Sequence, residues 1–147
     1  MLVALVVLSI GLLGMAKMVM VSSHSNDSAY LRSQATALAY QAMDSMRANL
    51  IAATANGYAT ALNVMPPATV NCSAVCSNTT LALSDVYGWK QHLRNALPAG
   101  TGSITTSATF PVMATVVVQW DDSAAQSVFN VPVAGNTQSI TLQTVLQ

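Results

Sequence analysis

The fold is decided by Leu2-Val-Ala-Leu-Val-Val-Leu-Ser-Ile-Gly-Leu-Leu-Gly14, which is followed after Lys17 by Met18-Val-Met-Val21. As a helix, the stretch from Met1 to Val21 is about as long as the hydrocarbon core of a bilayer is thick. Leaving such an apolar surface in water costs about 25 cal/mol per Å². We therefore expect this segment to enter a membrane, the core of a filament or a protein partner.

Two interpretations compete for this N-terminal run. Gly14-Met15-Ala16 has the small-x-small form of a signal-peptide cleavage site, which would leave a secreted binding domain beginning at Lys17. However, no basic segment precedes the run, and the apolar pattern resumes after Lys17. We favour a retained membrane helix over residues 1–22.

Residues 23–55 are expected to continue this helix in amphipathic form. Apolar residues recur there at intervals of three and four, as expected for one face of a helix, while Arg32, Asp44 and Arg47 fall elsewhere around it. The residues expected to pack on a sheet are Leu31, Ala35, Leu38, Ala42 and Met46. The pattern predicts one helix from Met1 to about Ala55, with Asn56-Gly57 as its stop signal.

The composition argues against nucleic-acid binding and against catalysis. Five Lys and Arg residues balance five Asp residues, glutamate is absent, and there is no basic excess to attract phosphates. The sequence lacks nucleophile-elbow, phosphate-loop and zinc-protease motifs. Asp121 and Asp122 fit a turn, and His92 fits a solvated helix position better than a catalytic base. We therefore expect no enzyme activity, no cofactor and no metal.

The only two cysteines, Cys72 and Cys76, follow a proline-containing loop. A zinc site needs four ligands, and only His24 and His92, both remote in sequence, could join them. In an exported chain we favour a local disulfide that shapes the loop, because closing so short a loop stabilises a fold only modestly.

A second, shorter helix is predicted over residues 84–97. Ser84 is a suitable N-cap, Asp85 suits the positive end of the helix dipole, and Pro98 and Gly100 end the helix. Its apolar face includes Trp89, which we expect to anchor the packing.

The last third of the chain is predicted to form strands over residues 103–110, 113–120, 128–133 and 139–146. Asp121-Asp122-Ser123 and Gly135-Asn136 supply turns, and Pro132 places its strand at an edge or a strand end. Strands in this order predict an antiparallel meander of three or four strands, with one face covered by the amphipathic part of the first helix. The class is α+β, and residues 56–147 form its globular region.

Several blocks of residues together carry a family resemblance. They are the run from Leu2 to Gly14, Ser28-Ala-Tyr-Leu-Arg-Ser-Gln-Ala-Thr-Ala-Leu-Ala-Tyr40, Asp44-Ser-Met-Arg-Ala-Asn49, the Trp89 to Gly102 region and Val116-Val-Val-Gln-Trp120. These blocks resemble minor type IV pilins of the PilV family, the type IV pilus modification proteins. The resemblance implies a pilin-like fold, with a long helix half in the membrane and half on a four-stranded antiparallel sheet.

What the resemblance implies for function is assembly. Such a subunit is held in the inner membrane with its globular region in the periplasm, and is then extracted into a pilus at the cell surface. Its implied partners are membrane lipid before assembly, other minor and major pilins, an inner-membrane assembly platform and a tip adhesin. The residues implied to pack in the filament core are Leu2, Val6, Ile10, Gly11 and Gly14. Gly11 and Gly14 would permit close helix approach or local unwinding, unless they are ordinary membrane-helix glycines.

Two further expectations follow from the family pattern. In the family pattern a basic leader, a processing site and an acidic residue precede the apolar run. Either the coding sequence extends upstream of Met1 or the protein is a degenerate pilin, and we favour the first because the rest of the helix retains its pattern; we assign no processing residue. A type II secretion pseudopilin would have the same architecture and use the same helix. The block from Ala29 to Asn49 favours the pilus over that alternative.

Overall fold

The computed structural model describes residues 2–68, 72, 76–123 and 135–146. Its elements are α1 (Leu2–Ala48), α2 (Leu50–Thr54), α3 (Asn78–Ala96), β1 (Thr101–Thr106), β2 (Met113–Asp121) and β3 (Thr137–Val145). The chain thus combines a long N-terminal apolar helix with a three-stranded antiparallel sheet and further helices, in the α+β class expected from the sequence. The predicted strand over residues 128–133 lies outside the described residues.

The sheet is a meander in the order β1-β2-β3, with both neighbouring pairs antiparallel. The strands were predicted at residues 103–110, 113–120 and 139–146. The prediction for β2 agrees with the structure to within one residue. β1 begins and ends before its predicted bounds, and β3 begins two residues before its predicted start. Residues 107–112 form a turn instead of the end of β1. The Ser107 hydroxyl braces this turn by accepting a hydrogen bond from the Met113 amide at 2.8 Å.

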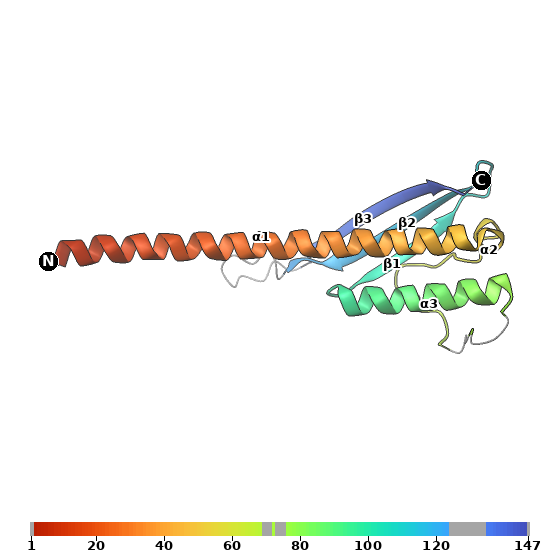
Figure 1. Ribbon diagram of the computed structural model, residues 1–147, viewed down its shortest axis with the longest axis horizontal. Helices are drawn as coiled ribbons and strands as arrows, with labels where there is room; N and C mark the ends of the chain where they lie inside the picture. The colour runs from red at the N-terminus through yellow and green to blue at the C-terminus, as the bar shows by residue number, and fades with distance from the viewer. Residues whose placement is uncertain (1, 69–71, 73–75, 124–134, 147) are drawn as a thin grey trace.

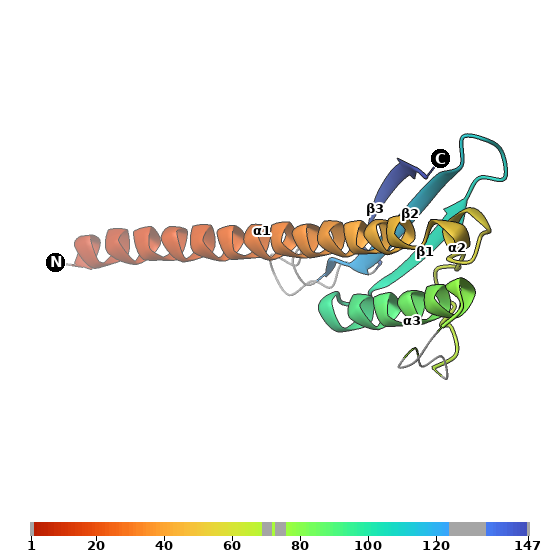
Figure 2. The ribbon, with the colours of Figure 1, turned by 45° about the vertical axis from the view of Figure 1, so that its right-hand side comes forward.

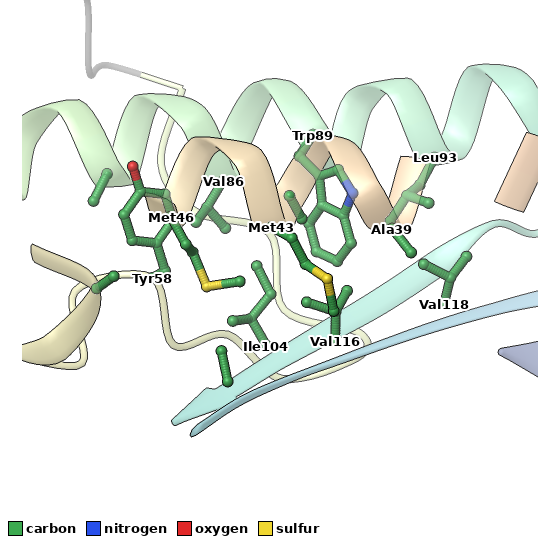
Figure 3. Packing of buried hydrophobic residues seen from close by; sticks show 14 of the residues in the cluster. Ala39, Met43, Met46, Tyr58, Val86, Trp89, Leu93, Ile104, Val116 and Val118 are labelled. Carbon is green, nitrogen blue, oxygen red and sulfur yellow. The ribbon is translucent and has the colours of Figure 1, made fainter. Parts of the chain in front are cut away.

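The second half of α1 lies beside α3, and both helices pack on the sheet, α1 against β2 and β3 and α3 against β1 (Figures 1 and 2). We call this packed part of the molecule, which includes the described residues from Ser28 onward, the head. Its core lies where α1, α3 and the inner face of the sheet meet (Figure 3). The alternation along β2 explains this layering, because Ala114, Val116, Val118 and Trp120 are buried and the residues between them are not.

The sequence predicted one continuous helix to about Ala55, and this prediction is wrong. The helix is interrupted at Asn49, whose φ of −127° and ψ of 63° lie outside the helical region. The reason is tertiary, because the buried Asn49 amide donates a hydrogen bond to the Asn78 carbonyl at the start of α3, at 2.7 Å. The stop at residues 56–57 is present: Asn56 adopts a left-handed φ of 62°, and the Gly57 amide donates to the Ala52 carbonyl at 2.7 Å.

The second predicted helix begins earlier than expected. Its N-cap is Ser77, whose hydroxyl accepts a hydrogen bond from the Thr80 amide at 3.1 Å, and not Ser84. Ser84 therefore lies within α3. Contrary to the prediction, Asp85 does not lie at the positive end of the helix dipole. It lies beyond the first turn of α3, where its carboxylate accepts a hydrogen bond from the Tyr58 hydroxyl. The prediction missed the first six residues of α3 because their run of Asn, Thr and Leu has no strong helical period.

Two glycines after α3 allow the chain to turn tightly onto the sheet. A Cβ on Gly100 would collide with the Leu93 carbonyl, and one on Gly102 would lie 2.6 Å from the Trp89 ring. Trp89 itself is buried, and its indole N–H donates to the Leu38 carbonyl at 2.9 Å. The ring therefore joins α3 to both α1 and β1, as a packing anchor.

Candidate functional site

The N-terminal half of α1 projects from the head with no other described element beside it (Figures 1 and 2). All described side chains from Val3 to Ser23 are exposed, with Val6 at 56% and Ile10 at 66%. The most apolar 18-residue window of the helix has a mean hydropathy of 2.2, and none of it is buried. By length and composition the helix can span a membrane.

This helix half satisfies its own polar groups, as a segment in an apolar medium must. The Ser9 hydroxyl can donate to the Leu5 or the Val6 carbonyl, each at 2.9 Å. Lys17 is the only charged residue from Leu2 to Asn26. The segment is therefore suited to lipid or to the apolar surfaces of neighbouring helices.

A shallow notch runs along one side of this segment at Gly11. Among the described residues, a Cβ at Gly11 or Gly14 would meet no other group within 4 Å. Both glycines leave backbone open on the helix surface, where another helix could approach closely. The notch is lined by Val3, Ala4, Val7, Leu8, Gly11, Leu12 and Met15. Of the residues implied to pack in a filament core, Val6 and Ile10 are also exposed, while the side chain of Leu2 lies outside the described set.

The second half of the same helix has the opposite environment. Ala35, Ala42 and Met46 are buried against the sheet, and Leu31 and Leu38 are partly buried beside them. The sequence reasoning did not single out two more buried residues, Ala39 and Met43, which Figure 3 places between α3 and the strands. Alanines at these positions let α1 approach the sheet closely.

One hydrogen bond secures α1 at the point where it leaves the head. The Ser28 hydroxyl donates to the Asp122 carboxylate at 2.7 Å, and Asp122 is 1% exposed. Asp122 was expected in a turn. It does follow β2 directly, and its neighbour Asp121 accepts a hydrogen bond from the Ser123 amide that lowers the pKa of the Asp121 carboxyl. The additional role of Asp122 in holding α1 was not predicted.

A buried lysine joins three segments of the head. The Lys90 ammonium donates to the carbonyls of Ala61 at 2.6 Å, Leu62 at 2.9 Å and Gly102 at 2.5 Å. Burial lowers the pKa of Lys90 to about 8, and the charge of Arg94 acts in the same direction. The sequence did carry a signal for this residue, because Lys90 follows Val86 by four positions and precedes Leu93 by three, on the apolar face of α3.

A second polar contact joins the segment after α2 to α3. The Tyr58 hydroxyl lies 2.7 Å from the Asp85 carboxylate and 3.1 Å from the Ser45 carbonyl, and Tyr58 is buried. Burial, the hydrogen bond to Asp85 and the Asp85 charge together hold the pKa of Tyr58 well above its usual value. Together with those of Lys90, these polar contacts link α1, α3, β1 and the segment after α2 within the head.

Cys72 and Cys76 form a disulfide, with their Cα atoms 5.7 Å apart. No group of three or more His, Cys, Asp or Glu side chains suited to a metal ion occurs within the described ranges. His92 is exposed and lies 3.3 Å from the Gln41 amide, and Asp44 pairs with Arg47 on the surface at 3.2 Å. The chemically distinctive surface of the described chain is therefore the apolar half of α1.

No family model, curated protein or solved structure matches this chain.

Proposed function

We propose that this chain is a filament subunit, specifically a minor type IV pilin. The observation that carries the proposal is that one helix has two environments. From Val3 to Val21 its side chains are exposed and, apart from Ser9 and Lys17, apolar, and from Ala35 to Met46 it is built into the core of the head. A helix that only anchored a domain in a membrane would not need to be the central element of that domain. In a filament subunit, by contrast, the helix must transmit force from the head to the filament core, so it has to be built into both.

In the proposed cycle, the apolar half of α1 holds the subunit in the inner membrane and the head lies in the periplasm. The subunit then moves into a pilus, where the same surface packs against the helices of other minor and major pilins. Leaving the lipid costs little because neighbouring helices supply an equally apolar environment, and Gly11 and Gly14 would allow those helices to pack closely. An assembly platform would drive the transfer, and a tip adhesin would be a further partner.

The experiment measures incorporation into pili sheared from the native cells, using the full chain. Asp in place of Ile10 would cost about 2.5–3.5 kcal/mol in an apolar medium. We expect Ile10→Asp to reduce recovery in the sheared fraction by roughly tenfold or more, because each 1.4 kcal/mol is a factor of ten. Ile10→Leu is the matched control and should behave as wild type. Normal recovery of Ile10→Asp would contradict the proposal. A chain needed for secretion but absent from pili would instead identify the type II secretion pseudopilin.

A further inference from the structure

A polar cavity lies in the head where the end of α3 meets the start of β1. Its volume is about 280 Å³, and it is lined by Asn63, Arg94, Ala99, Gly100 and Thr101. Arg94 lies in the last turn of α3, Thr101 begins β1, and Ala99, with a left-handed φ of 49°, lies in the turn between them. The cavity therefore forms where the segment after α2 packs beside the turn that follows α3.

The buried Lys90 lies next to the same cavity. Its ammonium donates to the carbonyls of Leu62 and Gly102, each of which is adjacent in sequence to a lining residue. The Thr101 hydroxyl also donates to the Leu62 carbonyl. Burial, and then the nearby charge of Arg94, lower the pKa of Lys90 to about 8. Two cationic groups thus share one cavity, with Arg94 in its wall and Lys90 behind it.

No acidic side chain of this chain neutralises the two charges. The sequence contains no glutamate, and its five aspartates all lie within the described residues. Asp27 is exposed on α1, and the other four contact groups elsewhere. Those groups are Arg47, Tyr58, the Ser123 amide and Ser28. Among the described residues, no ion pair joins an aspartate to Lys90 or Arg94. Because charges withdrawn from water are usually paired, an anion is the group that complements this cavity.

We propose that the cavity binds a carboxylate group. The Arg94 guanidinium presents parallel N–H donors whose spacing matches the two oxygens of a carboxylate, and the Asn63 amide can donate a further hydrogen bond. Lys90 contributes charge without donating to the ligand, because its hydrogen bonds go to three carbonyls. Phosphate fits less well, since its greater negative charge is repelled more strongly by the Leu62 carbonyl and by the negative end of the α3 dipole.

The carboxylate can come from a free organic acid or from an acidic side chain of a neighbouring subunit. The cavity is larger than a carboxylate alone requires, so it also admits the carbon stem that carries the group. A free acid as the source requires nothing of the proposed function, whereas a neighbouring subunit rests on it. Both sources present the same group to Arg94, and filament incorporation separates them.

The test measures ligand binding to the full chain in detergent micelles by NMR. The probe is glutamate capped at both backbone ends, which leaves one carboxylate, and the matched control is capped glutamine, which has the same shape without the charge. Capped glutamate should shift the Ala99, Gly100 and Thr101 amides saturably. Capped glutamine, and sodium chloride at equal ionic strength, should not.

The charge state of Lys90 gives a second measurement. A bound carboxylate should raise the pKa of Lys90, because a nearby negative charge favours the ammonium form. Capped glutamine should leave this pKa unchanged. The chain contains only two lysines, Lys17 and Lys90, so the titrating side-chain signal is readily assigned. A residue that only shaped the cavity wall would not produce this shift.

Arg94→Gln is the deciding variant, because Arg94 is exposed and its replacement should not impair folding. It should weaken binding of capped glutamate roughly tenfold or more, since it removes the charge-assisted, bidentate contact. Arg47→Gln removes the same charge from α1, where Arg47 contacts Asp44 and Thr144, and should bind as wild type. The comparison of capped glutamate with capped glutamine on the wild-type chain depends on neither variant.

Three results would overturn the inference: equal shifts by the two capped probes, equal binding by Arg94→Gln and wild type, or an unchanged Lys90 pKa at saturation. Tighter binding of inorganic phosphate, which carries the chemistry of a lipid headgroup, would overturn the choice of a carboxylate. Once binding is established, reduced recovery of Arg94→Gln in sheared pili identifies a neighbouring subunit as the source, and normal recovery identifies a free acid. Ile10→Asp should bind capped glutamate as wild type, so failure of filament incorporation and failure of carboxylate binding are separately visible.

Discussion

The exposed half of α1 and the head differ in where their side chains find contacts. The first is largely apolar, its described side chains from Val3 to Ser23 are exposed, and it contains one charged residue, Lys17. The head buries polar groups as well, and gives each of Lys90, Asp122 and Tyr58 a hydrogen-bonded neighbour. The exposed half therefore depends on its surroundings for stability, whereas the head depends on its own contacts.

The largest expected effect separates the two regions by core packing. Met46→Ala should lower the free energy of unfolding of the head by about 2–5 kcal/mol, because Met46 is fully buried between α3 and the sheet. Val6→Ala should leave that free energy unchanged. Both are measured by denaturant titration of the full chain, using the fluorescence of Trp89 and Trp120, which lie in the head. Equal destabilisation by the two variants would mean that the exposed half belongs to the cooperative unit of the head.

A smaller effect is expected at the boundary between the regions. Ser28→Ala removes the hydroxyl that donates to the buried Asp122 carboxylate, and hydrogen bonds to charged groups contribute about 1.5–3 kcal/mol. The loss should appear both in the free energy of unfolding and as faster amide exchange of α1 near residue 28. Ser23→Ala, at an exposed position of the same helix, is the control. An unchanged exchange rate at residue 28 would show that this contact does not hold α1 to the head.

The smallest expected effect is a pH dependence confined to the head. Burial lowers the pKa of Lys90 to about 8, from 10.5 in the unfolded chain. Between these values the unfolded chain binds a proton that the folded chain does not, so the free energy of unfolding should rise with pH. Above about pH 10 the raised pKa of Tyr58 acts in the opposite direction, since the folded chain then holds the extra proton.

The measurement compares unfolding midpoints between about pH 8 and pH 9.5, where the Lys90 contribution dominates. Lys90→Gln keeps N–H donors near the three carbonyls but does not titrate, so its midpoint should not rise over this range. A wild-type midpoint that falls with pH would mean that the carbonyls hold the ammonium in its charged form more strongly than burial disfavours it.

Much of the secondary structure was predictable because it follows from local periodicity. The long helix, the position of β2 and the stop at Asn56-Gly57 were read from apolar spacing and turn residues. The start of α3 was not predictable in this way. Its N-cap, Ser77, precedes a segment without a clear helical period, whereas the segment after Ser84 has such a period, so the sequence placed the start at Ser84. The proposed filament surface was predictable in the same way, since its only requirement is an uninterrupted apolar run.

The sequence by itself determined that an apolar helix leads into an amphipathic one and then into antiparallel strands, since these features depend on residues a few positions apart. The tertiary structure alone decided that α1 breaks at Asn49, that Asp122 holds Ser28, and that Lys90 joins the segment after α2 to β1. The physical reason is that the energies of buried polar groups depend on partners from distant parts of the chain. The identity of those partners is set only when the elements pack together.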